Sequence, residues 1–129
     1  MLWPTITVQD VDASLAFYRD KLGCPVDMRE QDANGTVFLG SVEVGDTVIM
    51  FESPDPGEQP VADRGARSGV TLTILLPISH NIDAFYTQLE AKGVRICNTI
   101  GNRPWGNRDF AIRDPDGYCL IFAKQAGVR

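Results

Sequence analysis

The sequence predicts an α+β fold of two tandem β-α-β-β-β modules, forming a curved, mostly antiparallel sheet around a cavity with the helices on its outer face. Three observations support this prediction: an amphipathic helix pattern occurs twice, a pair of apolar strands recurs at a matching distance, and a Pro-rich stretch separates the halves. The length of 129 residues suits a single domain, 1–129. Within it we expect module 1 at about 1–53, a linker at about 53–68 and module 2 at about 69–125.

Two helices are expected, at 12–22 and 81–92, and a glycine follows each of them. Either Asp10 or Asp12 can cap the first helix. The apolar residues at helical spacing are Leu15, Tyr18 and Leu22 in the first helix and Ile82, Phe85, Tyr86 and Leu89 in the second. The two patterns superpose when Asp12 is aligned with Asp83.

Eight strands are expected, four in each half, and they extend the repeat. They are Thr5–Val8, Val26–Glu30, Thr36–Val44 and Thr47–Glu52, then Val70–Leu75, Arg95–Cys97, Arg108–Arg113 and Tyr118–Ala123. Val48–Phe51 lies over Cys119–Phe122 at the same offset as the helices, whereas Thr5–Val8 lies over Thr71–Ile74 at a shorter offset. The Pro-rich stretch 53–60 cannot continue a sheet and therefore indicates the linker.

Composition narrows the function classes. With 17 acidic and 12 scattered basic residues, the net charge of −5 argues against a nucleic-acid partner and favours a neutral or cationic small ligand. No apolar run approaches the ~20 residues of a membrane span, so we expect no membrane partner. The N-terminal sequence Met1–Thr5 lacks the pattern of a secretory signal, and we expect a cytoplasmic protein.

Cysteine and histidine content limits the metal chemistry. Cys24, Cys97 and Cys119 form no Cys-x-x-Cys pair and are expected to be buried, reduced thiols. The single histidine, His80, excludes a histidine-rich site within one chain. We expect His80 to be an exposed loop or cap-region residue.

Four segments carry a family resemblance that covers essentially the whole chain. They are Val8–Tyr18, Leu22–Gly23, Trp105–Phe110 and Asp114–Gly117. Together they resemble the vicinal oxygen chelate superfamily, the group of glyoxalases, bleomycin-resistance proteins and ring-cleaving dioxygenases. The Trp-Gly-x-Arg-x-Phe stretch followed by Asp-Pro-Asp-Gly is most similar to the bleomycin-resistance branch. The resemblance implies a homodimer, in which the chains can exchange modules.

The metal-dependent members of this superfamily place a histidine or glutamate at each of four inward-facing strand positions. Here the resemblance assigns these positions to Trp3, Met50, Ile121 and either Gly69 or Thr71. None of these side chains is a ligand for a divalent metal. We therefore expect no metal site and no cofactor.

The same strand face has the composition of a small-molecule pocket, in which apolar walls supply burial and a few polar groups orient the ligand. The expected ligand-binding residues are Trp3, Thr5, Thr7, Val48, Met50, Glu52, Thr71, Thr73, Cys119 and Ile121. Three further candidates are Trp105, Phe38 and Arg108. Trp105 either stacks on a planar ligand or closes the end of the barrel or the subunit contact. Arg108 pairs with Asp109, with Asp114 or with a ligand carboxylate.

Three functions follow. The first is a metal-independent protein that sequesters a planar or cationic drug-like ligand in an apolar cleft of a dimer. The second is a glyoxalase-like or lyase-like enzyme, a lyase or isomerase without the usual metal, in which Glu52 acts as the acid or base. An exposed Glu52 would count against that enzyme. The third is a dimeric accessory module that binds no ligand.

Overall fold

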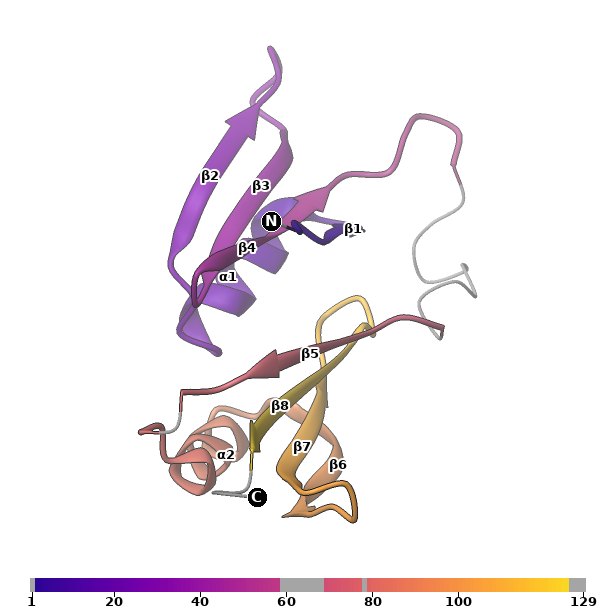
Figure 1. Ribbon diagram of the computed structural model, residues 1–129. Helices are drawn as coiled ribbons and strands as arrows, with labels where there is room; N and C mark the ends of the chain where they lie inside the picture. The colour runs from indigo at the N-terminus through magenta and orange to yellow at the C-terminus, as the bar shows by residue number, and fades with distance from the viewer. Residues whose placement is uncertain (1, 59–68, 78, 126–129) are drawn as a thin grey trace. The chain divides into compact units, whose positions relative to one another are not determined.

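The computed structural model describes residues 2–58, 69–77 and 79–125. The chain divides into two compact units, Met1–Arg64 (unit 1) and Gly65–Arg129 (unit 2). In the described residues, each unit contains one helix and one four-stranded sheet (Figure 1).

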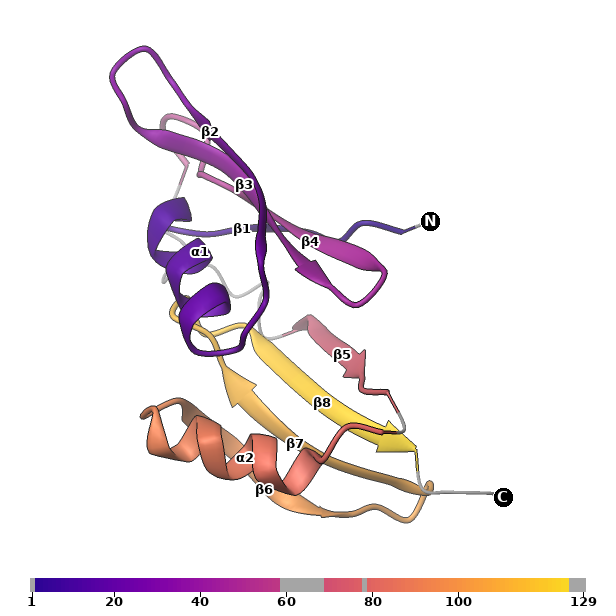
Figure 2. The ribbon, with the colours of Figure 1, turned by 90° about the vertical axis from the view of Figure 1, so that its left-hand side faces the viewer.

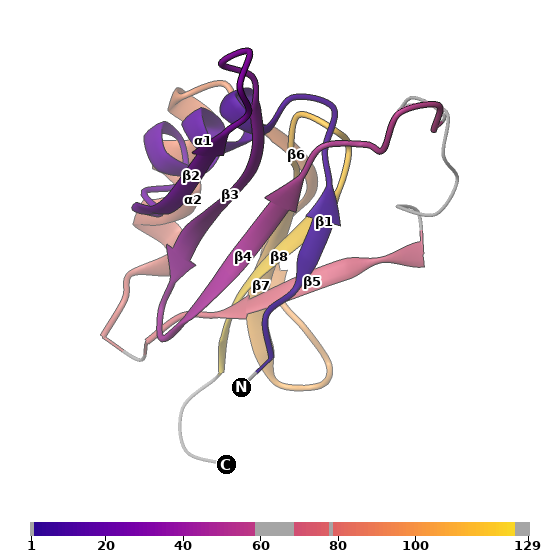
Figure 3. The ribbon, with the colours of Figure 1, turned by 90° about the horizontal axis from the view of Figure 1, so that it is seen from above.

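Unit 1 follows the order strand, helix, then three strands. Its elements are β1 (Thr5–Thr7), α1 (Val11–Asp20), β2 (Val26–Gln31), β3 (Val37–Val44) and β4 (Thr47–Glu52). The strands lie in the order β1-β4-β3-β2, as Figure 3 shows. β1 is parallel to β4, and the other neighbours are antiparallel.

Unit 2 repeats this plan. Its elements are β5 (Thr71–Leu75), α2 (Ile82–Ala91), β6 (Arg95–Asn102), β7 (Asn107–Arg113) and β8 (Cys119–Gln125). The strand order is β5-β8-β7-β6, with β5 parallel to β8. Figure 2 shows α2 running alongside this sheet.

The predicted α+β class with two tandem β-α-β-β-β modules is confirmed. The strands form two separate sheets, however, and each is mixed because its first strand pairs in parallel with its last. The shared cavity, the single domain and the module boundaries stay predictions. Of the predicted linker, 59–68 lies outside the described residues.

Both helices begin at the cap that the sequence repeat indicates, and each ends slightly earlier than predicted, at Asp20 and at Ala91, shortly before a glycine. The N-caps are Asp10 and Asn81, whose side chains each accept a backbone hydrogen bond at 3.0 Å, from Ala13 and Ala84 respectively. Asp10, rather than Asp12, is therefore the first cap. After α2, Gly93 adopts φ +76°, in the left-handed region that ends helices.

β6 is longer than predicted. It continues past Cys97 to Asn102, with register shifts between Ile96 and Asn98 and between Asn98 and Gly101. The segment after Cys97 lacks the alternation of apolar and polar residues that identifies a strand. Backbone pairing with β7 extends the strand there without that side-chain signal.

Each core lies between a helix and the sheet of the same unit. In unit 1, Tyr18 of α1 is fully buried and its ring lies 4.8 Å from that of Phe51. In unit 2, the Phe85 ring of α2 lies 5.0 Å from Phe122 and 6.0 Å from Phe110. Within the described residues, neither helix is long and apolar enough to cross a membrane.

Strand register corrects one part of the predicted repeat. Thr5 pairs with Met50, and Thr73 pairs with Ile121, which is the repeat partner of Met50. Thr5 therefore corresponds to Thr73 rather than to Thr71. The correction keeps each side chain on the same face, because Thr71 and Thr73 are one full period apart on a strand whose side chains alternate with a period of two.

Candidate functional site

In each unit one face of the sheet is turned away from the helix, and we name it the open face of that unit. In unit 1 the opposite face is identified by Gly40, where an added Cβ would lie 2.9 Å from Leu15 of α1. Strand alternation then assigns the open face. It holds the predicted residues Thr5, Thr7, Val48, Met50 and Glu52, together with Leu39, Ser41 and Glu43.

Acidic residues gather on the open face of unit 1. On β2, Glu30 pairs in register with Leu39, and the Asp27 carboxylate accepts a hydrogen bond from the Ser41 hydroxyl at 3.1 Å. Together with Glu43 and Glu52, four carboxylates lie on this face, and all four residues are exposed. None of the described strand residues of this face is basic. The face therefore presents a negative field.

Glu52 is exposed, and its Oε1 accepts a hydrogen bond of 3.2 Å from the Thr7 hydroxyl. Water keeps such a carboxylate hydrated, whereas a general base in an apolar cavity is desolvated. Exposure therefore favours ligand contact over catalysis for Glu52. Trp3 is also exposed, just before β1, and the next residue, Pro4, accepts a hydrogen bond from the Met50 backbone at 2.9 Å.

Phe38 lies apart from the other candidates. Along β3 it alternates with Leu39 and shares the face of Gly40 and Val42, which is the face that α1 covers. Phe38 is exposed near the start of β3, beside a register shift between β2 and β3. The structure does not bring Phe38 together with the candidates of the open face.

The open face of unit 2 holds the remaining strand candidates. Thr71 pairs with Cys119 and Thr73 pairs with Ile121, while Phe122 on the alternate positions faces α2. Both threonines are exposed and the two β8 residues are half-buried. The predicted strand candidates therefore form two sets, one on the open face of unit 1 and one on the open face of unit 2.

The four metal positions of the resemblance do not fit a divalent metal. The corrected register makes Thr71 the counterpart of Trp3, which selects Thr71 over Gly69. An indole, a thioether, a hydroxyl and an aliphatic chain then stand at the four positions, and such a set lacks the imidazole and carboxylate donors that hold these ions. In the part of the chain that the structure describes, no three His, Cys, Asp or Glu residues are grouped to hold a metal.

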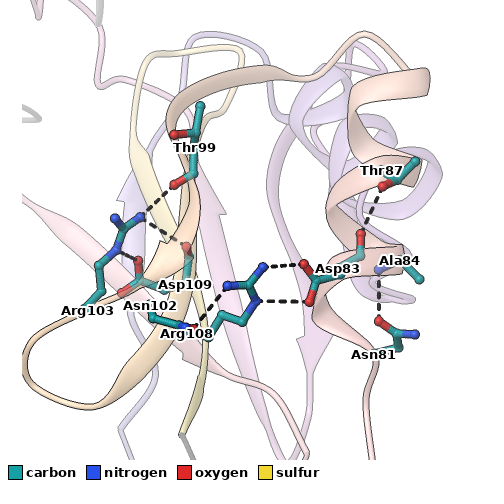
Figure 4. Close-up of polar contacts among 9 residues, drawn as sticks. All are labelled: Asn81, Asp83, Ala84, Thr87, Thr99, Asn102, Arg103, Arg108 and Asp109. Carbon is teal, nitrogen blue, oxygen red and sulfur yellow. Dashed lines mark hydrogen bonds and ion pairs between the residues drawn. The ribbon is translucent and has the colours of Figure 1, made fainter.

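Arg108 faces α2. Its Nη2 and Nε donate to the two carboxylate oxygens of Asp83 at 2.6 and 3.0 Å, and Nη1 donates to the Asn102 side chain at 3.1 Å (Figure 4). The hydrogen bond from Arg108 holds the pKa of Asp83 below its ordinary value of 3.8. The predicted pairing with Asp109 or Asp114 is wrong, because strand alternation points Arg108 toward the helix.

Arg103 is the partner that Asp109 uses instead. Its Nε donates to Asp109 Oδ1 at 2.6 Å and its Nη2 donates to the carbonyl of Thr99 at 2.7 Å, on the side of the strands away from Asp83 (Figure 4). The two charged side chains are only 19% and 9% exposed. Gly101, opposite Asp109 in register, leaves space that the guanidinium occupies. Arg103 is not among the residues that the sequence singles out. The available signal was Asp109, because an aspartate at a buried strand position requires a cation or hydrogen-bond donors nearby.

Asp114 closes the turn before β8. Its side chain accepts backbone hydrogen bonds from Asp116 at 3.0 Å and from Tyr118 at 2.9 Å. Trp105 lies in the hairpin turn between β6 and β7, where Gly106 adopts φ +97° and donates to the carbonyl of Arg103 at 2.9 Å. Trp105 is 63% exposed. Its role stays a prediction.

The cysteines and the histidine differ partly from expectation. All three cysteines are free thiols, but Cys97 is exposed rather than buried. Burial raises the pKa of Cys24 to about 11. His80 is partly buried rather than exposed, because its ring lies edge-on to that of Phe85, 5.4 Å away. It precedes the N-cap of α2, as the cap-region prediction has it.

Comparison with known proteins agrees with this fold. A bleomycin resistance protein of Geobacillus stearothermophilus is 29% identical over 130 residues, which cover 95% of this chain and 94% of that protein. The uncharacterized protein YwbC of Bacillus subtilis is 31% identical, with 91% and 90% covered.

Solved structures show the same similarity. TioX of Micromonospora sp. ML1 superposes with a TM-score of 0.77 at 19% identity, covering 96% of this chain and 97% of that chain. The bleomycin-binding protein of Streptomyces verticillus, in complex with copper(II)-bleomycin, superposes with a TM-score of 0.66 at 27% identity, covering 98% and 95%. The family profile of the Glyoxalase/Bleomycin resistance protein/Dioxygenase superfamily matches residues 1–122, so the chain belongs to this superfamily.

Proposed function

We propose that this protein is a cytoplasmic homodimer that binds a planar or cationic drug-like molecule in an apolar cleft, without a metal, and lowers its free concentration. The similarity to bleomycin resistance proteins over 95% of the chain supports a ligand of this class. The copper(II)-bleomycin complex of a relative at 27% identity supports it further. Sequestration needs no nucleophile, because binding by itself removes the free compound by mass action.

The observation that carries the cationic preference is the acidic open face of unit 1. Four exposed carboxylates, at Asp27, Glu30, Glu43 and Glu52, lie on this face, and the basic Arg29 of β2 is turned to the other side, where it pairs with Asp12 at 2.8 Å. An uncompensated group of like charges attracts a cation and repels an anion. Val48 and Met50, between these carboxylates, supply apolar surface for a planar body.

Two exposed indoles supply stacking groups. Trp3 precedes β1 and Trp105 lies in the β6–β7 turn. A tryptophan binds a planar aromatic or a cation on its face, with about 0.5–1.5 kcal/mol beyond simple burial. We therefore assign stacking to the indoles and charge selection to the carboxylates.

The test is a titration of the purified protein with metal-free bleomycin, copper(II)-bleomycin and a panel of planar cationic compounds, followed by calorimetry and tryptophan fluorescence. We expect saturable binding that weakens as salt is raised, because salt screens exposed charges. Glu52→Gln should weaken binding by about three- to tenfold. Glu90→Gln on α2 removes the same charge away from the strands and should leave the affinity unchanged.

Two results would contradict the proposal. One is the absence of binding to every planar or cationic compound by a folded protein. The other is an equal loss of affinity in Glu52→Gln and Glu90→Gln, which would mean that net charge, not the open face, governs binding. Chemical conversion of a bound compound that disappears in Glu52→Gln would support the enzyme instead. Sedimentation equilibrium tests the homodimer separately.

A further inference from the structure

The hairpin between β6 and β7 ends in a tight turn that carries Trp105. The backbone N–H of Arg103 donates to the carbonyl of Asn107 at 2.7 Å, and that of Gly106 donates to the carbonyl of Arg103 at 2.9 Å. Pro104 restricts φ at the second position of this turn, and Gly106 adopts the left-handed φ of +97° that completes it. The backbone around Trp105 is therefore well defined.

The corresponding turn of unit 1 has the same two backbone hydrogen bonds. The N–H of Asp32 donates to the carbonyl of Thr36 at 2.8 Å, and that of Gly35 donates to the carbonyl of Asp32 at 3.0 Å. The Asp32 side chain accepts from the backbone of Asn34 and Thr36 at 2.9 and 3.0 Å, so it acts within its own turn. Asn34 takes the place that Trp105 has in unit 2. In unit 2 the side chain that opens the turn is bonded to the sheet instead.

That side chain, Arg103, spans an irregular part of β6. Between Asn98 and Gly101, β6 has two residues where β7 has one, and such a bulge interrupts the regular hydrogen bonding between strands. Nη2 of Arg103 donates to the carbonyl of Thr99, inside the bulge, at 2.7 Å, while Nε donates to Oδ1 of Asp109 on β7 at 2.6 Å (Figure 4). The guanidinium thus ties the bulge of β6 to β7 close to the turn.

Net stability does not account for this mostly buried ion pair. Replacing both members of such a pair by apolar residues is often neutral or stabilising, because desolvation offsets their attraction. What the pair adds is direction, since the planar guanidinium fixes its acceptors at defined angles. The segment whose position it fixes is the end of the hairpin, where Trp105 is exposed. A stacking group that is already held in place loses less conformational freedom when a ligand binds.

We propose that Arg103 is a positioning residue that holds the end of the β6–β7 hairpin, and with it Trp105, in place for stacking on a planar ligand. The proposal rests on the ligand binding proposed above. Asp109 and the carbonyl of Thr99 are the fixed points of the sheet to which Arg103 is bonded. Loss of Arg103 therefore weakens ligand binding through Trp105, not through a contact of its own.

The first test needs no ligand and uses the full-length protein with Trp3→Phe, which leaves Trp105 as the single tryptophan. Time-resolved fluorescence anisotropy then reports how freely Trp105 moves on the nanosecond timescale. We expect the double variant Arg103→Met with Asp109→Leu to add a fast decay of the anisotropy. The matched control is Arg19→Met, which removes an arginine from an exposed ion pair on α1 and should leave the decay unchanged. Circular dichroism checks that each variant is folded.

The second test is the affinity for metal-free bleomycin, measured by calorimetry. The double variant loses one charge of each sign, so its net charge stays at −5. We expect its affinity to fall about three- to tenfold, whereas Arg19→Met should keep the wild-type affinity. Trp105→Ala should weaken binding at least as much as the double variant. In a Trp105→Ala background, the substitutions at Arg103 and Asp109 should have no further effect on affinity, because Arg103 acts through Trp105.

Two results would overturn the proposal. One is a folded double variant with the anisotropy decay of the wild type. The other is a loss of affinity that is equally large with and without Trp105, which would mean that Arg103 acts on the ligand by another route. If the wild type binds no bleomycin, that result contradicts the function proposed above, and the anisotropy comparison alone decides the positioning.

Arg103→Lys keeps the test decisive if the double variant does not fold. Lysine retains the positive charge beside Asp109, but its single ammonium group lacks the fork that bonds Asp109 and the Thr99 carbonyl together. We therefore expect Arg103→Lys to add the fast anisotropy decay of Trp105 as well. A folded Arg103→Lys protein with the wild-type decay would overturn the proposal.

Discussion

The open faces of the two units differ in charge although the units share one topology. The open face of unit 1 carries four carboxylates, whereas that of unit 2 carries the Arg103–Asp109 ion pair, Arg113 and Cys119. The helix-facing sides keep the apolar pattern of the repeat, with Ile49 and Phe51 matched by Leu120 and Phe122. Core packing constrains only the face under the helix, so the other face can diverge and carry function.

The helix-facing sides also differ at one position. Gly40 pairs with Phe51 in unit 1, and Phe110 pairs with Phe122 at the corresponding place in unit 2. Without a side chain at Gly40, Leu15 of α1 packs directly onto the backbone of β3. In unit 2 the Phe110 ring fills that space and contacts Phe85 and Tyr86 of α2. The core of unit 1 is thus filled by direct packing of the helix onto the strand backbone, whereas the core of unit 2 is filled by a cluster of aromatic rings.

The largest effect is expected from Phe110→Ala, which removes the centre of the unit 2 cluster. Phe110 is fully buried, and truncation of such a residue costs about 3–5 kcal/mol in the free energy of unfolding. Denaturant unfolding followed by circular dichroism measures it. If Phe110→Ala lowered the free energy of unfolding by less than Gly40→Ala does, the aromatic cluster would not be a main source of the stability of unit 2.

Asp109→Leu copies into unit 2 the residue that unit 1 has at the corresponding place, Leu39. It leaves the Arg103 guanidinium without its partner, and breaking a mostly buried ion pair costs about 3 kcal/mol. The double variant with Arg103→Met should recover most of that loss, because no charge is then left uncompensated. Additive losses in the double variant would mean that the two residues stabilise the unit independently.

Gly40→Ala tests the close approach in unit 1. The added Cβ would lie 2.9 Å from Leu15 Cδ1 and 3.2 Å from the Met28 carbonyl oxygen, and relief of that overlap costs about 1–3 kcal/mol. The double variant Gly40→Ala with Leu15→Val shortens the Leu15 side chain and should regain part of the loss. A Gly40→Ala protein as stable as the wild type would refute the packing explanation.

The smallest effect concerns the aspartate in the first turn of each helix. Hydrogen bonds from Arg29 and Arg108 hold the pKa values of Asp12 and Asp83 below 3.8. A lowered folded-state pKa stabilises the fold at pH values well above 3.8 and loses that contribution as the pH falls through the folded value. Asp12→Asn and Asp83→Asn should therefore lower the melting temperature slightly at neutral pH, with the difference shrinking in acid. If the difference in melting temperature between variant and wild type grew as the pH fell, the two aspartates would not stabilise the fold in their charged form.

These two ion pairs show how far the sequence predicts the structure. The repeat places Asp12 and Asp83 at matching helix positions, but the arginine comes from β2 in unit 1 and from β7 in unit 2. Periodicity locates both helices because each must bury one stripe of side chains. No periodic signal indicates which of several nearby arginines reaches a given carboxylate. The sequence therefore leaves Asp109, Asp114 and a ligand carboxylate open for Arg108, whereas Arg108 pairs with Asp83 and Arg103 binds Asp109.

The candidate residues on the strands were assigned to faces by alternation, which holds wherever a strand is regular. Thr5, Thr7 and Met50 share a face for that reason, and so do Thr71 and Ile121. Alternation is less informative where a strand contains a register shift, as at Cys97, which is exposed although a buried thiol was expected. It also places Phe38 on the same side of β3 as Gly40, away from the open face, although Phe38 itself stays exposed.

By itself the sequence determined the class of the fold, the two modules and the approximate positions of the helices, because these depend on local period. The mismatch with a divalent metal follows from residue chemistry at four strand positions that the family resemblance assigns. Only the tertiary structure decided the match of Thr5 with Thr73, the partners of Arg103 and Arg108, and the acidic open face. Each of these depends on which strands are neighbours and in what register. Register is a long-range property, set by how a whole sheet packs against its helix.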